Sequence, residues 1–469
     1  MHTQRRSFLR GSAAAAFSLV LPRGLRAQDA NKKLQVACVG VGGQGGGDME
    51  RVMQGARVIG ICDVDSTRLD KAATKATEAE KFRDFREMID KLGDKLDGVV
   101  ISTPDHAHFP AAMHAISRGK HVMVQKPLVN TLWEADQLRQ AAAKKGVTTN
   151  MGNQGHTGNG IRRLREWVKM GAIGKVREVH VWTNRPIWPQ GVEKYAEAEC
   201  PETLDWKLWQ AANPDSHYID GVHPFKWRGH LQYGAGAMGD MGCHIMDGPF
   251  WACGLTSPSR MVAEVQGLTN CSWPKGGKVI CDFEKEGIVF NWYEGKDSND
   301  DPYLPLAALE PFIKDKKTMP WKVKDKMEWI PIDPRRFRVN PAIGGFLIIG
   351  ESGAFMNFGD YCDSPFLIGQ EAHEKWMAAH GKVEIEESLA PGNPQLEWVR
   401  AIEKGVKPGS NFDYSVPLTE LCLLGNLAMR CGGTTTWDTA KRTTGKAEHD
   451  KFLKRPAYRA GYDYTAEKV

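Results

Sequence analysis

An acid and an imidazole stand four residues apart in one glycine-rich segment of the chain. Residues 234–247 read Gly-Ala-Gly-Ala-Met-Gly-Asp-Met-Gly-Cys-His-Ile-Met-Asp, which places the acid at Asp240 and the imidazole at His244. At this spacing both side chains lie on one face of a helix. Such a pair can do acid–base chemistry, because the imidazole moves a proton while the carboxylate sets its orientation and basicity. The same spacing also occurs in ordinary helix ion pairs, so the pattern alone leaves both interpretations open.

A glycine-rich loop near the N-terminus carries a second chemical signal. The apolar run 34–39 predicts a strand, and Gly-Val-Gly-Gly-Gln-Gly follows directly. In this GxGxxG pattern Gly40 permits a tight turn, Gly42 lets the backbone approach a pyrophosphate, and Gly45 lets the next helix pack closely. That helix would present free N–H groups and a positive dipole end to phosphates. The loop residues expected to bind a dinucleotide are Gly40, Gly42, Gly43, Gln44 and Gly45.

The acid that ends the second predicted strand indicates which dinucleotide is bound. The apolar run 57–62 is followed by Asp63, which stands 23 residues after Gly40. This is the expected position of the carboxylate that accepts hydrogen bonds from the adenosine ribose hydroxyls. Because a carboxylate there repels a 2′-phosphate, we expect NAD as the cofactor rather than NADP.

The first domain is predicted to be a doubly wound α/β sheet of the Rossmann type. Further strands over 97–102, 121–124 and 147–151 alternate with helices over 109–118 and 131–145. Such alternation is typical of parallel strands, and ligands bind at the carboxyl ends of those strands. The residues at these ends that we expect to meet the cofactor are Thr103, Pro104, His106, Lys126 and Asn153.

The second domain changes character to α+β. A run of predicted strands without intervening helices indicates a mostly antiparallel sheet with helices on one face. The predicted strands are 176–186, 260–268, 278–283, 287–293, 345–350 and 353–358, and helices near 394–404 and 416–430 close the fold. We expect a long surface excursion over 295–342. The expected boundaries are 28–152 for the Rossmann domain, 153–435 for the second domain and 436–469 for a polar C-terminal tail.

The basic excess of the chain lies at its N-terminus. The chain has 62 Lys+Arg and 57 Asp+Glu, and the five arginines of residues 1–27 account for the whole net charge of +5. A neutral body argues against nucleic acid or an anionic membrane as partner. Residues 4–10 carry a twin-arginine pattern, and the apolar stretch after them is too short to span a bilayer. We therefore expect a twin-arginine signal peptide over 1–27, periplasmic location and no membrane attachment after cleavage. The alternative is a disordered basic tail on a cytoplasmic protein.

Several polar and aromatic side chains could line a ligand site, since polar groups can hydrogen-bond a ligand and aromatic rings suit its apolar faces. For each of them loop capping or core packing is the alternative. The substrate-binding candidates are Gln154, His156, His223, Trp227 and Arg228, with Trp188, Trp206 and Trp209 as further aromatic candidates. His106 and His108 form an HxH pair, but two ligands are too few for a metal site, so no metal is expected. The ten cysteines include no CxxC pair and predict no disulfide framework.

Taken together, these motifs resemble the glucose–fructose oxidoreductase / inositol dehydrogenase (Gfo/Idh/MocA) family, over nearly all of the chain after residue 27. The resemblance implies a Rossmann domain followed by an open-faced sheet whose free face commonly forms a subunit interface, hence a homodimer or homotetramer. The segment 223–229, just before the helix expected to be catalytic, resembles an exported, sugar-directed branch. The residues that carry the resemblance are 40–45, Thr103-Pro104-Asp105-His106, Lys126-Pro127, 151–156, Asp240 with His244, and 410–414.

The resemblance also assigns roles at the site. Lys126 would lie near the nicotinamide and the substrate hydroxyl, Asp240 would bind substrate and orient His244, and His244 would be the general acid/base. One residue departs from the family pattern, since Gln125 stands where Glu is usual before the lysine and proline. With one carboxylate fewer, Lys126 is expected to lose its proton more readily.

These inferences lead to two enzymatic hypotheses and one that is not enzymatic. The first is an NAD-dependent oxidoreductase that transfers hydride between a sugar, polyol or glycoside hydroxyl carbon and the nicotinamide. The second is an enzyme that cleaves glycosides by transient oxidation with a tightly bound NAD. The third is a sugar-binding protein without activity, against which the intact Lys126, Asp240 and His244 argue.

Overall fold

The computed structural model describes residues 33–339 and 344–469. The twin-arginine pattern at residues 1–27 lies outside this part of the chain. Among the helices of the described residues, none is both long enough and apolar enough to cross a membrane.

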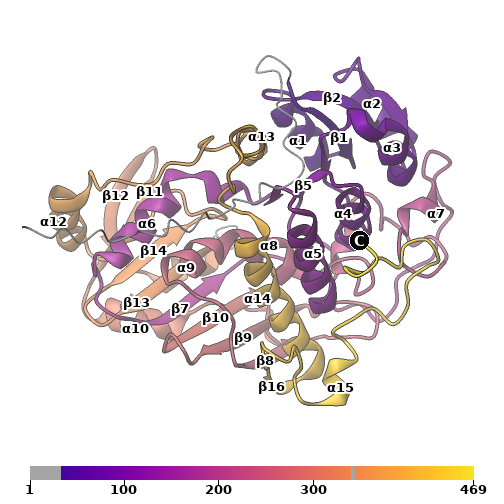
Figure 1. Ribbon diagram of the computed structural model, residues 1–469. Helices are drawn as coiled ribbons and strands as arrows, with labels where there is room; N and C mark the ends of the chain where they lie inside the picture. Colours follow the sequence, from indigo (N-terminus) through magenta and orange to yellow (C-terminus); the bar gives the residue numbers. More distant parts are fainter. Residues whose placement is uncertain (1–32, 340–343) are drawn as a thin grey trace, which may run out of the picture. The chain divides into compact units, whose positions relative to one another are not determined.

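The first sheet is parallel throughout (Figure 1). Its strands lie in the order β3-β2-β1-β4-β5-β6, so the order reverses between β1 and β4. Ligands of such sheets bind in the crevice outside the carboxyl ends of the strands at this switch point. The predicted Rossmann architecture is thereby confirmed. The strands are β1 (Gln35–Val39), β2 (Arg57–Cys62), β3 (Glu80–Phe82), β4 (Gly98–Ile101), β5 (His121–Val124) and β6 (Thr149–Met151).

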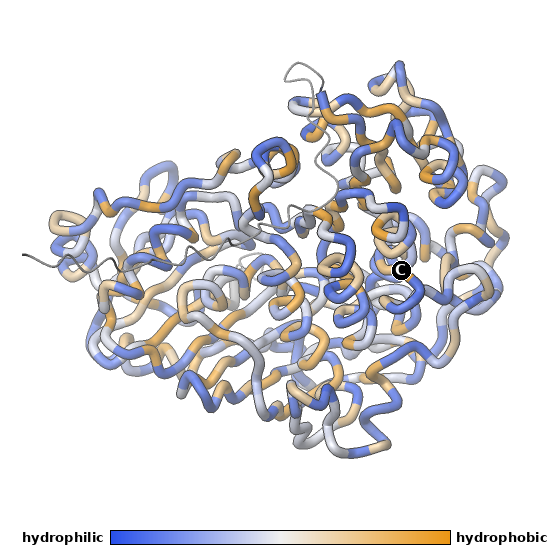
Figure 2. The backbone as a smooth tube through the Cα atoms, in the orientation of Figure 1, coloured by the Kyte–Doolittle hydropathy of each residue, from blue (hydrophilic) through white to orange (hydrophobic). Residues whose placement is uncertain are grey.

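Helices cover both faces of this sheet, which explains its nearly continuous apolar strands (Figure 2). The side chains of Asp65, Asp84 and Thr131 cap the first turns of three of the helices, and Gly146 ends the longest in a left-handed conformation. The helices are α1 (Gln44–Val52), α2 (Ser66–Ala73), α3 (Phe85–Leu92), α4 (His108–Ser117) and α5 (Leu132–Lys145), and α13 (Pro394–Lys404) returns to pack beside α1.

The second sheet has eight strands in the order β15-β14-β13-β7-β10-β9-β8-β16. Every neighbouring pair is antiparallel except β7 with β10, which confirms the mostly antiparallel sheet. The strands are β7 (Val176–Trp182), β8 (Arg260–Gln266), β9 (Gly276–Phe283), β10 (Ile288–Gly295), β13 (Gly345–Gly350), β14 (Ala354–Phe358), β15 (Phe366–Leu367) and β16 (Gly433–Thr436).

Four helices pack on the inner face of this sheet (Figure 1). Alternate strand residues point toward them, so Phe283, Phe290, Trp292 and Phe355 join one core cluster with the helices. One of these helices carries both Asp240 and His244, as the sequence predicted. The helices are α6 (Asn159–Lys169), α8 (Gly236–Ile245), α9 (Asp247–Ala252) and α14 (Phe412–Cys431).

The excursion over 295–342 does more than run along the surface. It forms α10 (Leu306–Lys314), the hairpin β11 (Thr318–Val323) and β12 (Lys326–Pro331), and α11 (Pro334–Val339). Leu309 and Met319, both fully buried, pack there with Trp182 of the outer sheet face. The outer face is therefore covered over part of its area. The few apolar residues that do this are spaced among many lysines, aspartates and prolines, which made the segment look solvated.

The C-terminal stretch, expected to be a polar tail, is packed against the first domain. It contains a short helix α15 (Ala447–Asp450), and Tyr462 beyond it is 3% exposed. The Arg455 guanidinium is buried and donates to the carboxylate of Glu134 (2.6 Å), to Asn213 and to the backbone oxygen of His106. The last residues of the chain thus tie α5 and the β4–α4 connection together.

We predict that Arg455→Met destabilises the protein by about 3–5 kcal/mol, because it leaves the Glu134 carboxylate, which is 0% exposed, without its cation. The double variant Glu134→Leu/Arg455→Met should recover most of that loss. Urea unfolding monitored by circular dichroism measures both. Lys468→Met, which breaks an exposed ion pair with Asp463 in the same stretch, is the control and should change little. An equally small effect of Arg455→Met would contradict the prediction.

Candidate active site

The glycine loop has the geometry of a dinucleotide cradle. Gly40 and Gly43 have positive φ angles of 76° and 53°, which side chains rarely adopt. A Cβ on Gly45 would lie 1.9 Å from the backbone oxygen of Gly40, so only glycine lets α1 start this close to the loop. Within the described residues no side chain caps the N-terminus of α1, where Gln44 begins the helix. The N–H groups of Gly45 and Gly46 donate to the backbone oxygens of Gly42 and Gly43, so it is the positive end of the helix dipole that would face an anion here.

Asp63 lies against this loop at the end of β2, as predicted. Its carboxylate accepts hydrogen bonds from the backbone N–H groups of Val41 and Asp65, both at 3.0 Å. Burial raises the pKa of Asp63, while these two hydrogen bonds and the nearby Arg68 oppose the rise. The acid is thus fixed where the ribose of a dinucleotide would meet the strand end.

Three polar side-chain atoms at the ends of β4 and β6 are buried without a hydrogen-bond partner among the described residues. They are Thr103 Oγ1, Asn153 Nδ2 and Gln154 Oε1. Leaving a buried polar group unpaired costs about 1–3 kcal/mol, so such a cluster beside the loop fits a site that a polar ligand completes. Pro104 follows Thr103 and precedes a short 3₁₀ turn, Asp105–Ala107. The residues present therefore fit a bound dinucleotide.

An ion pair joins the end of β5 to α8. Lys126 Nζ lies 2.9 Å from Asp240 Oδ1 and 2.8 Å from the Asp240 backbone oxygen. The Arg228 Nε donates to the same Oδ1 at 3.1 Å. Burial opposes the charge of Asp240, but Lys126 and Arg228 outweigh it and lower the pKa of this carboxyl well below its usual range. Asp240 is thus an anion held between two cations.

His244 is oriented by Asn153 instead of by Asp240. Its Nδ1 lies 3.2 Å from Asn153 Oδ1, and within the described residues the Asp240 carboxylate makes no hydrogen bond to it. With Oδ1 as acceptor, Nδ1 carries the proton and Nε2 is the basic nitrogen. Burial lowers the pKa of His244 to about 3, and Lys126 adds to the effect while Asp240 opposes it. The imidazole is therefore neutral and able to accept a proton.

Three charged residues to which the sequence analysis gave no role interact electrostatically with Lys126, Asp240 or His244. Asp105 Oδ2 accepts from the backbone N–H of Ala235, directly before α8, and burial raises the pKa of Asp105 to about 7. Asp360 follows β14 and Arg185 follows β7. Burial raises the pKa of Asp360, while Arg185 and Lys126 oppose the rise. A signal existed for each, since all three lie at or just beyond the ends of predicted strands.

Three predicted histidines are held by hydrogen bonds to groups other than Lys126, Asp240 and His244. His106 is fully buried, and its Nε2 lies 2.7 Å from the backbone oxygen of Trp209. His156 is also buried, 3.1 Å from the carboxylate of Asp247. His223 Nε2 lies 3.1 Å from Asp65 Oδ2, beside the end of β2. None of the hydrogen bonds that the described part of the chain gives these side chains reaches Lys126, Asp240 or His244.

Aromatic rings surround the guanidinium of Arg228, which donates to Asp240. Its guanidinium carbon lies 4.2 Å from the centroid of the Trp227 ring, 4.9 Å from that of Phe225 and 5.8 Å from that of Trp188. Trp227 and Trp188 are buried, but Phe225 is 42% exposed, and Ile187, next to Trp188 in sequence, is 61% exposed. The charged group thus has an apolar rim on one side. Trp206 and Trp209 stack on each other at 4.7 Å and belong to the same hydrophobic cluster as Trp227.

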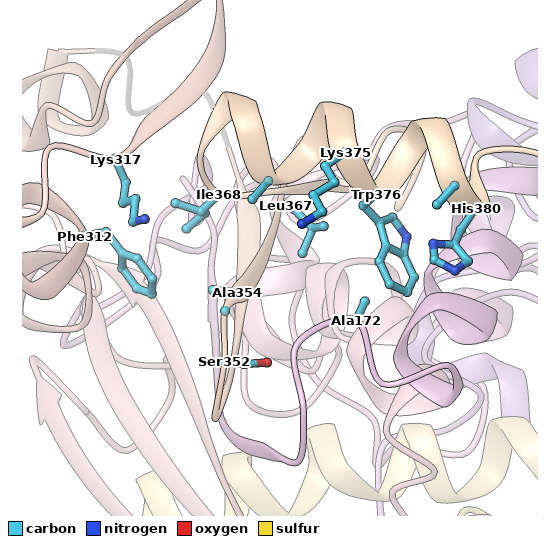
Figure 3. A pocket seen from close by; sticks show the side chains of 13 residues that line it. Ala172, Phe312, Lys317, Ser352, Ala354, Leu367, Ile368, Lys375, Trp376 and His380 are labelled. Atoms are coloured by element: carbon cyan, nitrogen blue, oxygen red, sulfur yellow. The ribbon is translucent and has the colours of Figure 1, made fainter.

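The molecule also has a cavity of about 440 Å³ away from these residues (Figure 3). It lies between α12 (Gln370–His380) and the turn that joins β13 to β14. Trp376 and His380 stack at one end, and the side chains of Lys317 and Lys375 extend into it. Its lining includes no acid and no strand end of the parallel sheet. The cavity therefore lacks the combination of acid, base and nucleotide loop that the site around Asp240 and His244 has. In the described ranges no group of three or more His, Cys, Asp or Glu could hold a metal ion.

Two family models match the chain in succession. Residues 34–153 match an oxidoreductase family with an NAD-binding Rossmann fold (GFO_IDH_MocA), and residues 158–268 match the C-terminal alpha/beta domain of that oxidoreductase family (GFO_IDH_MocA_C2). The first model and the loop geometry agree that the first domain binds NAD.

Curated relatives are distant and match in part. Inositol 2-dehydrogenase of Rubrobacter xylanophilus is 27% identical over 199 residues, which are 42% of this chain and 53% of that protein. A glycosyl hydrolase family 109 protein of Shewanella sp. is 26% identical over 154 residues, 30% of this chain and 33% of that protein. The matched segments thus span about half or less of these relatives.

Solved structures share the fold over most of their length. The WlbA dehydrogenase of Bordetella pertussis, in complex with NADH and UDP-GlcNAcA, gives a TM-score of 0.58 at 14% identity, covering 87% of this chain and 99% of that one. Levoglucosan dehydrogenase in complex with NADH gives 0.55 at 15% identity, covering 86% and 98%. At these identities the likeness is one of fold.

We predict that the stability of the protein falls between about pH 4 and pH 7 through Asp105. Its pKa is raised in the folded state to about 7, so folding retains a proton that the unfolded chain releases above about pH 4. The cost reaches about 4 kcal/mol at pH 7 and above. Asp105→Asn should therefore gain melting temperature over the wild type at pH 8 relative to pH 5. The exposed Asp70→Asn is the matched control, and equal pH dependence of all three proteins would contradict the assignment.

Proposed function

The chain belongs to the Gfo/Idh/MocA oxidoreductase family, and we propose that it transfers hydride between NAD and a hydroxyl-bearing carbon of a sugar, polyol or glycoside. The observation that carries this proposal is the convergence of Lys126, Asp240 and His244 beside the ends of the parallel strands. A cation, an anion and a neutral base are gathered there from β5 and α8, next to the nucleotide loop.

Residues of the first domain would hold the cofactor. The loop around Gly42 and the N-terminus of α1 would bind the pyrophosphate, and Asp63 would accept from the ribose hydroxyls. When bound, NAD takes up or supplies a hydride at its nicotinamide ring. Because Asp63 is an acid fixed at the ribose position, it favours NAD over NADP.

The second domain and Lys126 would handle the proton and the charge. His244 Nε2 is the basic nitrogen, so it would accept the hydroxyl proton as the alcohol is oxidised. Lys126 would stabilise the negative charge that develops on the oxygen. Asp240 fixes Lys126 and Arg228 by two hydrogen bonds to one oxygen atom. The low pKa of His244 keeps the imidazole unprotonated.

The rim beside Arg228 supports a carbohydrate substrate. The exposed Phe225 offers a ring face against which the C–H face of a pyranose can stack, and Arg228 offers N–H donors to its hydroxyls. The relatives include inositol dehydrogenases and a glycosyl hydrolase, which agrees with a polyol or sugar substrate.

A second candidate function, glycoside cleavage by transient oxidation with a retained NAD, is favoured by one feature. A segment of the second domain pairs with the chain just after β2, through the hydrogen bonds Ser66 N–H to Thr203 O and Asp205 N–H to Val64 O. Together with the contact between His223 and Asp65, this segment lies beside the ribose-binding acid. Such a cover would slow cofactor exchange, as a cofactor regenerated within each turnover requires.

Location and assembly are further parts of the proposal. The twin-arginine pattern of residues 1–27 supports export to the periplasm of a protein folded with its cofactor. A homodimer or homotetramer would use the part of the outer sheet face that the excursion leaves free, where Val289 of β10 is 38% exposed.

The first test is the cofactor content of the purified, exported protein, released by denaturation and assayed as NAD(H) and NADP(H). Near-stoichiometric NAD supports the retained cofactor and the second candidate. Protein that arrives empty but binds added NAD supports an exchanging dehydrogenase. Protein that binds neither nucleotide contradicts the proposed function.

We predict that Lys126→Met and His244→Ala each lower kcat by about 10²–10⁴-fold on any substrate found in a sugar and polyol panel, since each removes a group needed in the transition state. NAD binding by His244→Ala should remain. The exposed Lys81→Met and His217→Ala are matched controls. Turnover that persists in the double variant Lys126→Met/His244→Ala would contradict the mechanism.

We further predict that Phe225→Ala raises KM about tenfold for substrates with a second sugar or aryl ring, with little change in kcat, because the variant removes a stacking surface and no reacting group. Steady-state kinetics on paired one-ring and two-ring substrates measure this. Met327→Ala removes an exposed apolar side chain from β12 and serves as the control. An equal effect on both substrate sizes would argue against a platform for a second ring.

A further inference from the structure

A buried carboxylate stands behind the nucleotide loop. Asp48 lies on α1, one turn beyond the start of the helix, and is 1% exposed. Four uncharged donors surround it. Oδ1 accepts from Gln44 Nε2 (2.8 Å) and Gln395 Nε2 (2.7 Å), and Oδ2 accepts from Ser102 Oγ (2.8 Å) and Gln125 Nε2 (2.7 Å). The acid thus connects α1, the ends of β4 and β5, and α13.

Burial raises the pKa of Asp48, and the hydrogen bonds from Ser102, Gln44 and Gln125 oppose the rise. Arg51, one turn further along α1, approaches only to 4.0 Å. The carboxylate therefore depends chiefly on hydrogen bonds for its solvation. A buried acid with all four acceptor positions occupied holds its surroundings rigidly, because each partner is costly to lose.

Gln125 is the partner that reaches the reacting groups. Its amide nitrogen donates to Asp48, while its carbonyl oxygen lies 3.4 Å from the backbone nitrogen of Lys126. The same amide packs on Gly152, where a Cβ would lie only 2.5 Å from Nε2. Gly152 precedes Asn153, the residue that orients His244. One amide therefore touches the chain segments of both Lys126 and Asn153.

The donor and acceptor pattern explains why residue 125 is an amide. A glutamate there would bring a second carboxylate within about 3 Å of Asp48 in a buried site, where two like charges cannot both ionise. The carboxylate and the amide can, however, trade places between positions 48 and 125 and keep the same hydrogen-bond partners. An asparagine at position 48 would accept from Gln44 and Gln395 at its side-chain oxygen. Its amide nitrogen would donate to a glutamate at position 125 and to the Ser102 oxygen.

We propose that Asp48 and Gln125 form an acid–amide positioning pair. This pair holds the nucleotide loop, Lys126 and the Asn153–His244 pair in fixed positions relative to one another. The inference rests on the proposed function, because it assigns the pair to the alignment of cofactor and catalytic groups.

The test compares Gln125→Glu, Asp48→Asn and the double variant Asp48→Asn/Gln125→Glu. Affinity for NADH is measured by fluorescence titration without substrate, and melting temperature and turnover are measured beside it. Each single change should weaken NADH binding at least tenfold and lower kcat by a similar factor, because it sets two acceptors or two donors against each other. The double variant should return both quantities to within about threefold of the wild type. Gln54→Glu, an exposed change at the end of α1, is the matched control.

The results separate a positioning role of Asp48 and Gln125 from a purely structural one. Singles that lose only melting temperature while NADH affinity and kcat stay within twofold of the wild type would overturn it. So would a double variant no better than the singles, or one that does not fold. Singles that fail to fold beside a folded double variant would also overturn it, because only stability would then depend on the pair. Wild type that fails to bind NADH contradicts the proposed function itself, whereas wild type that binds NADH and turns over no sugar still allows the affinity comparison.

Discussion

The ion pair between Lys126 and Asp240 is the contact on which the site depends. It spans two domains, since the lysine follows β5 of the parallel sheet and the aspartate lies on α8 of the second domain. Both side chains are only about an eighth exposed, at 13% and 12%, so the pair is not weakened by bulk water as a surface pair is. Arg228 adds a second cation on the same oxygen. The charge of Asp240, the place of Lys126 and the field at His244 all follow from this cluster.

Three buried acids of the structure differ in the partners that surround their carboxyl groups. Asp240 keeps its charge because two cations face it. Asp48 relies on four neutral donors, and Asp105 has a single backbone N–H, with a pKa raised to about 7. These differences follow from the number and charge of partners within reach, since burial acts on all three alike.

Much of the fold could be predicted from the sequence, because strands and helices leave local patterns of hydrophobicity. Five of the six Rossmann strands, six of the eight strands of the second sheet and α8 lie close to their predicted positions, whereas the short strands β3, β15 and β16 were not predicted. The glycine loop and Asp63 could be assigned because their motif has one structural context. Partners distant in sequence could not. Nothing local indicated that Asn153 would orient His244, that His156 would be buried with Asp247, or that His223 would lie beside Asp65. The excursion over 295–342 was misjudged for the same reason, since its buried residues become apparent only against the sheet face that they cover.

The packing of the C-terminal stretch has a consequence for biosynthesis. Domains made first usually fold first as the chain emerges from the ribosome. Here the first domain includes a buried carboxylate, Glu134, whose cation is Arg455, near the very end of the chain. The buried position of Glu134 on α5 thus requires a residue that follows it by 321 positions in the sequence. The native packing of the first domain is therefore not completed by its own segment of the chain.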